Sequence, residues 1–108
     1  MKIKDFTALC REINETEWDK GFNDHGVNLG EKLALVHSEL SEALEELRRE
    51  EPCASEKIPD FPAVADELAD AVIRIMSISV HLDVDLEGAI VAKSNYNKTR
   101  PHKHGKRF

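Results

Sequence analysis

Apolar residues recur at intervals of three and four along four segments of this chain, and no segment alternates apolar and polar residues for long. Side chains three and four positions apart share one face of a helix, whereas alternation is typical of strands. Helices are expected over residues 2–18, from residue 28 to a connector at 51–61, over residues 62–82, and from residue 83 or 85 to 98. The sequence therefore predicts an all-α, four-helix bundle-like domain.

Capping and turn residues support these boundaries. Asn28 and Glu31 have the spacing of a capping box, and Pro62 suits a first helical turn, where its missing amide donor is not needed. Gly21 and Gly26 favour a loop over residues 19–27. The core face of the second helix is expected to contain its regularly spaced apolar residues, namely Leu29, Leu33, Val36, Leu40, Leu44 and Leu47.

The size of the chain predicts one domain. Its 108 residues are 41% hydrophobic and 33% charged, which suits a single soluble domain over residues 1–108 with a basic C-terminal tail at 98–108. Charged residues interrupt the most apolar segment, residues 64–82, so we expect no membrane partner. The polar N-terminal segment lacks the apolar region of a signal peptide, which favours a cytoplasmic location. Cys10 and Cys53 are expected to be reduced and structurally incidental.

Charge is distributed unevenly along the chain. Residues 1–87 carry nine bases against 21 acids, a net charge of -12, whereas residues 93–108 carry six bases and no acid. An acidic body is a poor partner for duplex nucleic acid, so that class of function is excluded. The pattern suits a divalent cation together with a small polyanion, although such blocks are commonly just solvated surface.

Carboxylates with helical spacing are the strongest candidates for chemistry. Apolar side chains cover roughly 220° of the third helix, and Glu67 and Asp70 lie in the remaining stripe. Burying such charges without a partner is costly, so they must face water, a cation or a cleft. Glu39 and Glu42 have the same spacing on the second helix, and four oxygen donors would suit magnesium or manganese. For the second helix alone, a solvated acidic surface is the simpler interpretation.

Two further groups have side chains suited to a nucleotide. Lys93, Asn97 and Arg100 share one face of the fourth helix and could donate to phosphate oxygens, or simply form a solvated basic helix end. Trp18, Phe22 and Asn23 could stack on and read a base, although a tryptophan is more commonly core or interface. None of the histidines has the spacing of a zinc site, and none is assigned as a ligand: His25, His37, His81, His102 and His104.

Three segments resemble the MazG-like nucleoside triphosphate pyrophosphohydrolases of the all-alpha NTP pyrophosphatase group. GEKLALVHSELSEALEELR and VADELADAVIRI are similar to the two acidic motifs of that family, and KSNYNKTRPHKHGKRF is similar to the C-terminal motif of its small bacterial and phage-type members. Together with KGFND near the start, the resemblance covers nearly the whole chain. It implies a MazG-type domain that assembles as a homo-oligomer.

The resemblance implies a role for each candidate. Glu39, Glu42, Glu67 and Asp70 would hold Mg²⁺ or Mn²⁺ during hydrolysis of a nucleoside or deoxynucleoside triphosphate between its alpha and beta phosphates. Ser38 stands where the family often has an acid, so Glu42 or Glu39, or a metal-bound hydroxide, would act as the base. The three residues of the fourth helix would bind phosphate and sugar, and the loop at residues 18–28 would form the base pocket.

Oligomerisation is expected because the third helix has more apolar surface than three neighbours in one small bundle can cover. A homodimer or a dimer of dimers is therefore predicted, with sites near the interface. Two alternatives remain open. One is a phosphoribosyl-ATP pyrophosphohydrolase, an enzyme of the same broad architecture, and the other is a non-enzymatic helical dimerisation or regulatory module whose acids are only surface.

Overall fold

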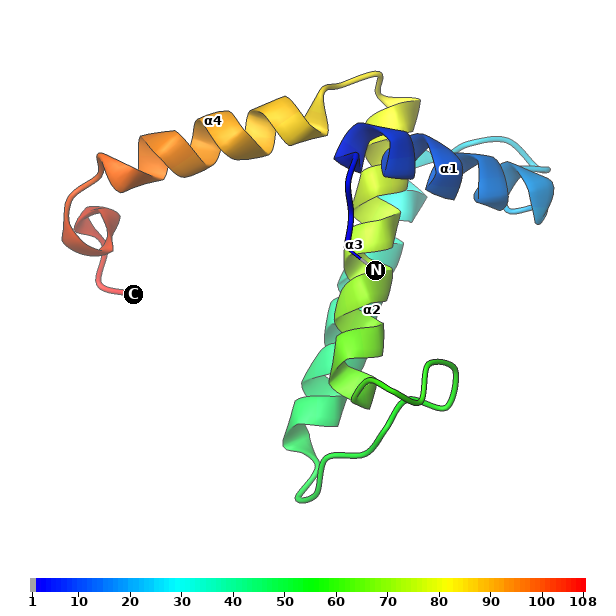
Figure 1. Ribbon diagram of the computed structural model, residues 1–108, viewed down its shortest axis with the longest axis horizontal. Coiled ribbons are helices and arrows are strands. Elements are labelled where there is room, and N and C mark those ends of the chain that lie inside the picture. The colour runs from blue at the N-terminus through cyan, green and yellow to red at the C-terminus, as the bar shows by residue number, and fades with distance from the viewer. Residues whose placement is uncertain (1) are drawn as a thin grey trace.

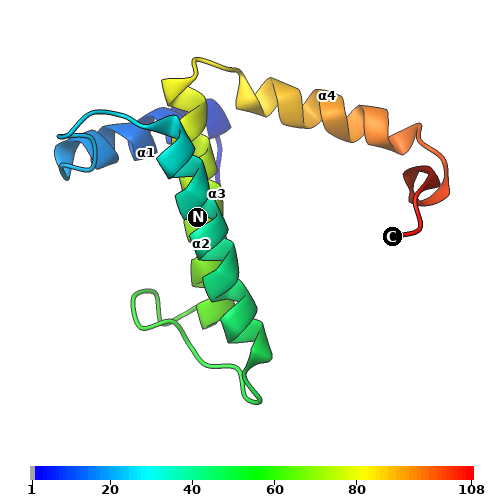
Figure 2. The same cartoon turned by 180° about the vertical axis from the view of Figure 1, so that it is seen from behind.

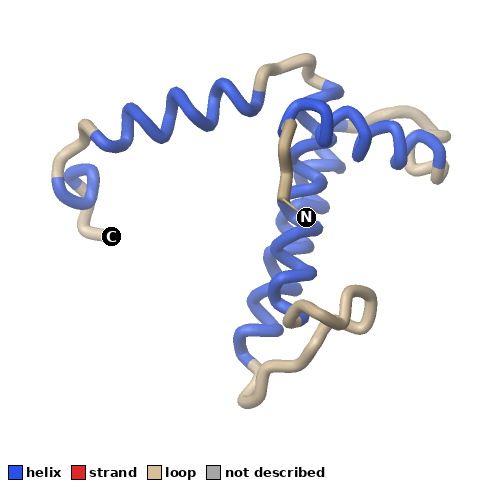
Figure 3. The backbone as a smooth tube through the Cα atoms, in the orientation of Figure 1, coloured by secondary structure: helices blue, strands red, loops and turns tan. Residues whose placement is uncertain are grey.

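The computed structural model describes residues 2–108, which fold into four α-helices (Figure 1). These are α1 (Phe6–Asp19), α2 (Leu29–Arg48), α3 (Ala63–His81) and α4 (Leu86–Lys98), followed by a short 3₁₀ helix, η1 (His102–Gly105). Figure 3 shows only helices and loops in this part of the chain, which confirms the all-α prediction. None of the helices within residues 2–108 combines the length and the apolar character that a membrane crossing requires.

Side-chain caps define where three of the helices begin. Asn28 accepts a hydrogen bond from the Glu31 amide at 3.0 Å, as the sequence predicted for the start of α2. Asp85 caps α4 in the same way. The first helix begins at Phe6, later than predicted, because Asp5 is extended and its carboxylate accepts from the Ala8 amide at 3.0 Å. Residues before that cap therefore lie outside the helix.

The centre of the molecule is an antiparallel pair formed by α2 and α3, which lie side by side in both Figure 1 and Figure 2. Helix α1 crosses the end of this pair where α2 begins and α3 ends, and it packs on α3. Val36, Ala71 and Ile78 form the main buried cluster. The small side chains of Ala43 and Ala71, which are 4% and 3% exposed, favour a close approach of the two helices.

The predicted core face of α2 is mostly wrong for a single chain. Val36 is buried, but the leucines that flank it are exposed by 47–70%: Leu33, Leu40, Leu44 and Leu47. The face of α2 that packs on α3 instead includes Glu39 and Ala43. The leucine row is exposed because no further helix of the same chain covers it. Several apolar residues of α3 are likewise exposed by 39–50%: Leu68, Val72, Ile73 and Ile75.

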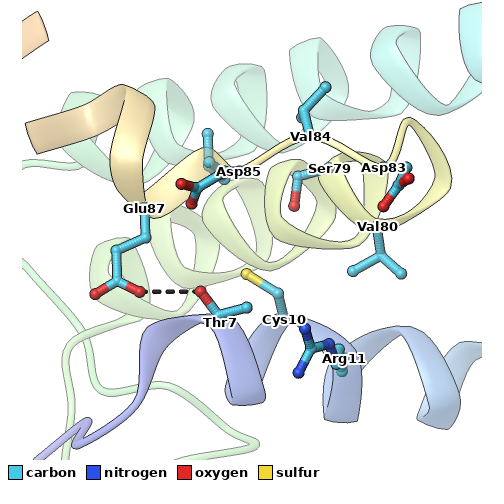
Figure 4. A pocket seen from close by; sticks show the side chains of 10 residues that line it. Thr7, Cys10, Arg11, Ser79, Val80, Asp83, Val84, Asp85 and Glu87 are labelled. Carbon is cyan, nitrogen blue, oxygen red and sulfur yellow. Dashed lines mark hydrogen bonds between the residues drawn. The ribbon is translucent and has the colours of Figure 1, made fainter. Parts of the chain in front are cut away.

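Helix α4 extends away from the other three helices, so one chain does not close a four-helix bundle (Figures 1 and 2). None of its residues is buried. Its first turn is tied to α1 by a hydrogen bond from the Thr7 hydroxyl to Glu87 at 2.9 Å. Figure 4 shows this bond at a cavity of about 100 Å³ whose lining includes Cys10, Ser79 and Asp85. The junction fixes where α4 starts, and the rest of the helix has little contact with its own chain.

Candidate metal centre

Three of the four predicted metal ligands meet between α2 and α3. Glu67 and Asp70 are one turn apart on α3, and Glu39 faces them from α2. One carboxylate oxygen from each residue lies within 4.8 Å of the other two. Glu39 is only 9% exposed. It is therefore not part of a solvated acidic surface, which was the simpler interpretation of the spacing on this helix. The packing of α2 on α3 creates this cluster.

Glu42, the fourth predicted ligand, is one turn after Glu39 and is exposed. It lies close enough to Glu67 for hydrogen bonding and for its charge to affect that carboxyl. Desolvation is the largest cause that raises the pKa of Glu67 from 4.5 to about 7, and the hydrogen bond and charge of Glu42 come next, followed by those of Glu39. The Glu67 carboxyl is therefore protonated more readily than an ordinary glutamate.

Asp70 also lies in a strongly negative environment. Desolvation, followed by the charges of Glu39 and Asp66, raises the pKa of Asp70, whereas the charges of Lys57 and Arg74 lower it. A divalent cation would relieve the repulsion among these acids. All the donors are carboxylate oxygens, the hard ligands that Mg²⁺ and Mn²⁺ favour, so the residues fit the predicted metal.

Two cations beside the carboxylates were not among the predicted site residues. The Arg74 guanidinium nitrogen Nε lies 3.0 Å from Oε1 of Glu39, with which it forms a partly buried ion pair. Arg74 lies one turn after Asp70, so helical spacing could have identified it. Lys57 comes from the connector at residues 51–61, where nothing in the sequence indicated a site.

The carboxylates border open space. A pocket of about 300 Å³ is lined by Glu39 and Asp70 and also by Lys57 and Arg74. A second pocket, of about 460 Å³, extends toward the loop before α2. The two pockets share three lining residues, Glu17, Phe22 and Arg74. Their combined size suits a small organic ligand such as a nucleotide.

The three residues predicted to bind a base lie in different environments. Phe22 is 71% exposed and lines both pockets, which agrees with a role in stacking. Trp18 is half exposed and packs at a tilt against His81, with 6.3 Å between ring centroids. Asn23 is only 3% exposed, and neither polar atom of its side chain has a hydrogen-bond partner in the part of the chain that the structure describes.

Of the predicted phosphate-binding residues, Lys93 and Asn97 lie on α4, whereas Arg100 follows the end of the helix at Lys98. None of the three lies beside the carboxylates of the same chain. The Lys93 ammonium is 4.9 Å from the centroid of the Tyr96 ring, and the Arg100 guanidinium carbon is 5.7 Å from it. Asn97 lines a shallow pocket together with Lys93. Because α4 points away from the α2–α3 pair (Figure 1), a single chain does not bring this group to the acidic cluster.

No family model, curated protein or solved structure matches the chain. The resemblance to MazG-like enzymes therefore depends on the motifs in the sequence. The geometry adds a carboxylate cluster, two adjoining pockets and two unexpected cations.

Proposed function

We propose that this protein is a magnesium-dependent nucleoside triphosphate pyrophosphohydrolase of the MazG-like type. It would hydrolyse a nucleoside or deoxynucleoside triphosphate to the monophosphate and pyrophosphate. The observation that carries this proposal is the convergence of Glu39, Glu67 and Asp70 within 4.8 Å, from two motifs that are far apart in the sequence. The adjoining pockets provide space for a nucleotide beside that cluster.

The metal would supply charge neutralisation at the phosphates and acidify the attacking water. Glu39, Glu67 and Asp70 would hold it, with Glu42 as a fourth ligand from the next turn of α2. Of the two candidate bases, Glu42 is exposed and adjoins Glu67, whereas Glu39 is in an ion pair with Arg74, so Glu42 is the better placed to accept a proton from water. Phe22 would stack on the base, because its exposed ring borders both pockets.

The active form would be a homodimer or a dimer of dimers. The exposed leucine row of α2 and the exposed apolar residues of α3 would be covered by another copy. Assembly would also give α4 a surface to pack on. Lys93, Asn97 and Arg100 would then contact phosphate or sugar only where α4 of one copy reaches the pocket of another.

The direct test is pyrophosphate release from a panel of canonical and damaged triphosphates, with and without magnesium. Wild-type protein is expected to release pyrophosphate only with the metal, and Glu67→Gln is expected to abolish turnover while the chain stays folded. Glu45→Gln is a matched control, because Glu45 is an exposed acid of α2 that pairs only with Arg48 in the described structure. Full magnesium-dependent activity in Glu67→Gln would contradict the metal-site assignment.

Adding phosphoribosyl-ATP to this panel separates the alternatives. Turnover of phosphoribosyl-ATP alone would favour the phosphoribosyl-ATP pyrophosphohydrolase. If no nucleotide yields pyrophosphate and magnesium does not change the melting temperature, the acids hold no metal. The protein would then be a helical dimerisation or regulatory module.

A further inference from the structure

The connector between α2 and α3 contributes a cation to the acidic pocket. Lys57 lines the pocket of about 300 Å³ together with Glu39 and Asp70, and its charge lowers the pKa of Asp70 against the influence of the surrounding acids. The connector therefore supplies a positive charge to this pocket, which Glu17 of α1 also lines. A segment that only linked two helices would not need to place a lysine there.

Hydrogen bonds hold this part of the connector in a defined conformation. Ser55 is 4% exposed, and its hydroxyl donates to the Asp66 carboxylate at 2.6 Å. The same oxygen accepts from the amides of Lys57 and Ile58 at 3.1 and 3.0 Å. The Ser55 amide donates in turn to the Phe61 carbonyl at 2.9 Å. These bonds anchor the backbone of Lys57 to the first turn of α3, immediately before Glu67.

Arg74 is the second cation of the pocket, and it already occupies a candidate metal ligand. Its Nε is 3.0 Å from Oε1 of Glu39, and its side chain is 35% exposed. It also borders the larger pocket, so it lies where the two pockets adjoin. A divalent cation that binds Glu39 would compete with this ion pair. The displaced guanidinium would then need another anion.

We propose that Lys57 and Arg74 bind the phosphate groups of the substrate, and that Arg74 exchanges Glu39 for a phosphate oxygen when metal and polyphosphate bind. This rests on the proposed function, and it adds a phosphate-binding group that each chain supplies for itself. Two cations and the carboxylates that would hold a metal line the same pocket, which suits a metal-bound polyanion. Ser55 is a positioning residue, because it acts through the backbone of Lys57.

Replacing each cation in turn separates metal binding from phosphate binding. Arg74→Met frees Glu39 from its ion pair, so it should tighten binding of Mg²⁺ alone while weakening binding of pyrophosphate. Lys57→Met should weaken binding of pyrophosphate without weakening that of Mg²⁺. Loss of a charge-assisted hydrogen bond corresponds to roughly a ten- to hundredfold loss of affinity. A cation with only a structural role would not change the two affinities in opposite directions.

Titration calorimetry on the full chain tests this, first with Mg²⁺ alone and then with inorganic pyrophosphate in saturating Mg²⁺. Lys4→Met, at an exposed lysine before α1, is the matched control and should behave as wild type. Ser55→Ala should reproduce the loss seen with Lys57→Met, and Ser55→Thr should restore binding. Arg74→Gln serves as a second variant if Arg74→Met unfolds, since it keeps a polar group beside Glu39.

Three outcomes are informative. Weaker pyrophosphate binding in both cation variants, with tighter Mg²⁺ binding in the Arg74 variant, supports the proposal. If both variants bind pyrophosphate as tightly as wild type does, Lys57 and Arg74 do not bind phosphate and the inference is overturned. In that case the proposed function still stands if the wild-type protein binds Mg²⁺ and turns over a nucleotide. Wild-type protein that binds neither Mg²⁺ nor pyrophosphate would overturn the proposed function and this inference together.

Discussion

Glu67 is the residue at which the electrostatics of the site are most unusual. Its neighbours Glu42 and Glu39 come from α2, so the repulsion on Glu67 exists only when the two helices are packed. Unfolding separates the helices and removes this repulsion. The acidic cluster therefore opposes folding in the absence of metal, and metal binding would reverse the sign of that contribution.

The raised pKa of Glu67 predicts how the stability of the protein depends on pH. The pKa of the Glu67 carboxyl is about 7 in the folded protein and 4.5 without the fold, so the folded state holds more protons in that interval. Stability conferred by the protonated group is therefore present below about pH 4.5 and is lost as pH rises through about 7. Glu67→Gln cannot lose a proton, so its melting temperature should increasingly exceed that of wild type across this interval.

Melting curves in a chelating buffer measure this difference, with Glu45→Gln as the control. Adding Mg²⁺ should stabilise wild type at the upper end of the interval and should have little effect on Glu67→Gln. A difference in melting temperature that stays constant with pH would contradict the folded-state pKa.

At the level of single residues, the sequence predicted the acids better than the bases. Glu67 and Asp70 could be placed on one face from helical spacing, whereas Glu39 was singled out by the resemblance, because spacing alone favoured a solvated surface for α2. Lys57 could not be predicted, because its position depends on the bond between Ser55 and Asp66, which are 11 residues apart. No local pattern in a connector specifies which side chain of the next helix will anchor it.

Among the elements, the contact between α1 and α3 depends on a buried polar network. The Asn14 amide donates to the Ser77 hydroxyl at 3.2 Å and lies 3.2 Å from Nε2 of His81. Burial, and then the charge of Lys32, lowers the pKa of His81, which favours the neutral imidazole that can accept this bond. Asn14 and Ser77 are 7% and 1% exposed, so water could not readily take the place of either side chain if one of them were removed.

Asn14→Ala should therefore destabilise the protein by about 1–3 kcal/mol, because it leaves a buried hydroxyl without its donor. Chemical denaturation measures the change. Glu15→Ala, at the exposed neighbouring position, should change stability much less. Equal stability of the two variants would show that the network contributes nothing to the docking of α1.

The sequence predicted where elements begin more successfully than which of their faces are covered. Asn28 could be identified as a cap because capping depends on neighbours within one turn. The leucine row of α2 was assigned to the core, because periodicity identifies an apolar face without saying which chain covers it. The single chain buries Val36 of the predicted face together with Glu39 and Ala43, and it leaves the leucine row exposed.

For the whole molecule, the exposed leucines are the basis of the oligomer proposal. Leu44 is 56% exposed near the middle of the row. Leu44→Glu would place a charge in a contact that excludes water, so this variant should sediment as a monomer while wild type sediments as a dimer or a larger species. Sedimentation velocity measures this directly.

Ala34→Glu is the matched control for that experiment. It adds the same charge to an exposed position on another side of α2, so assembly should be unaffected. If Leu44→Glu assembles as wild type does, or if wild type is itself monomeric, the leucine row is not the interface. The helices should remain intact in either case, since Glu is a good helix former.

Helix α4 has 13 residues and none of them is buried. Peptides of this length are only marginally helical on their own in water. The helical structure of α4 would then depend on the concentration of the protein. On dilution α4 would lose its helical structure first, and Lys93 and Asn97 would no longer share a face before the rest of the protein melts.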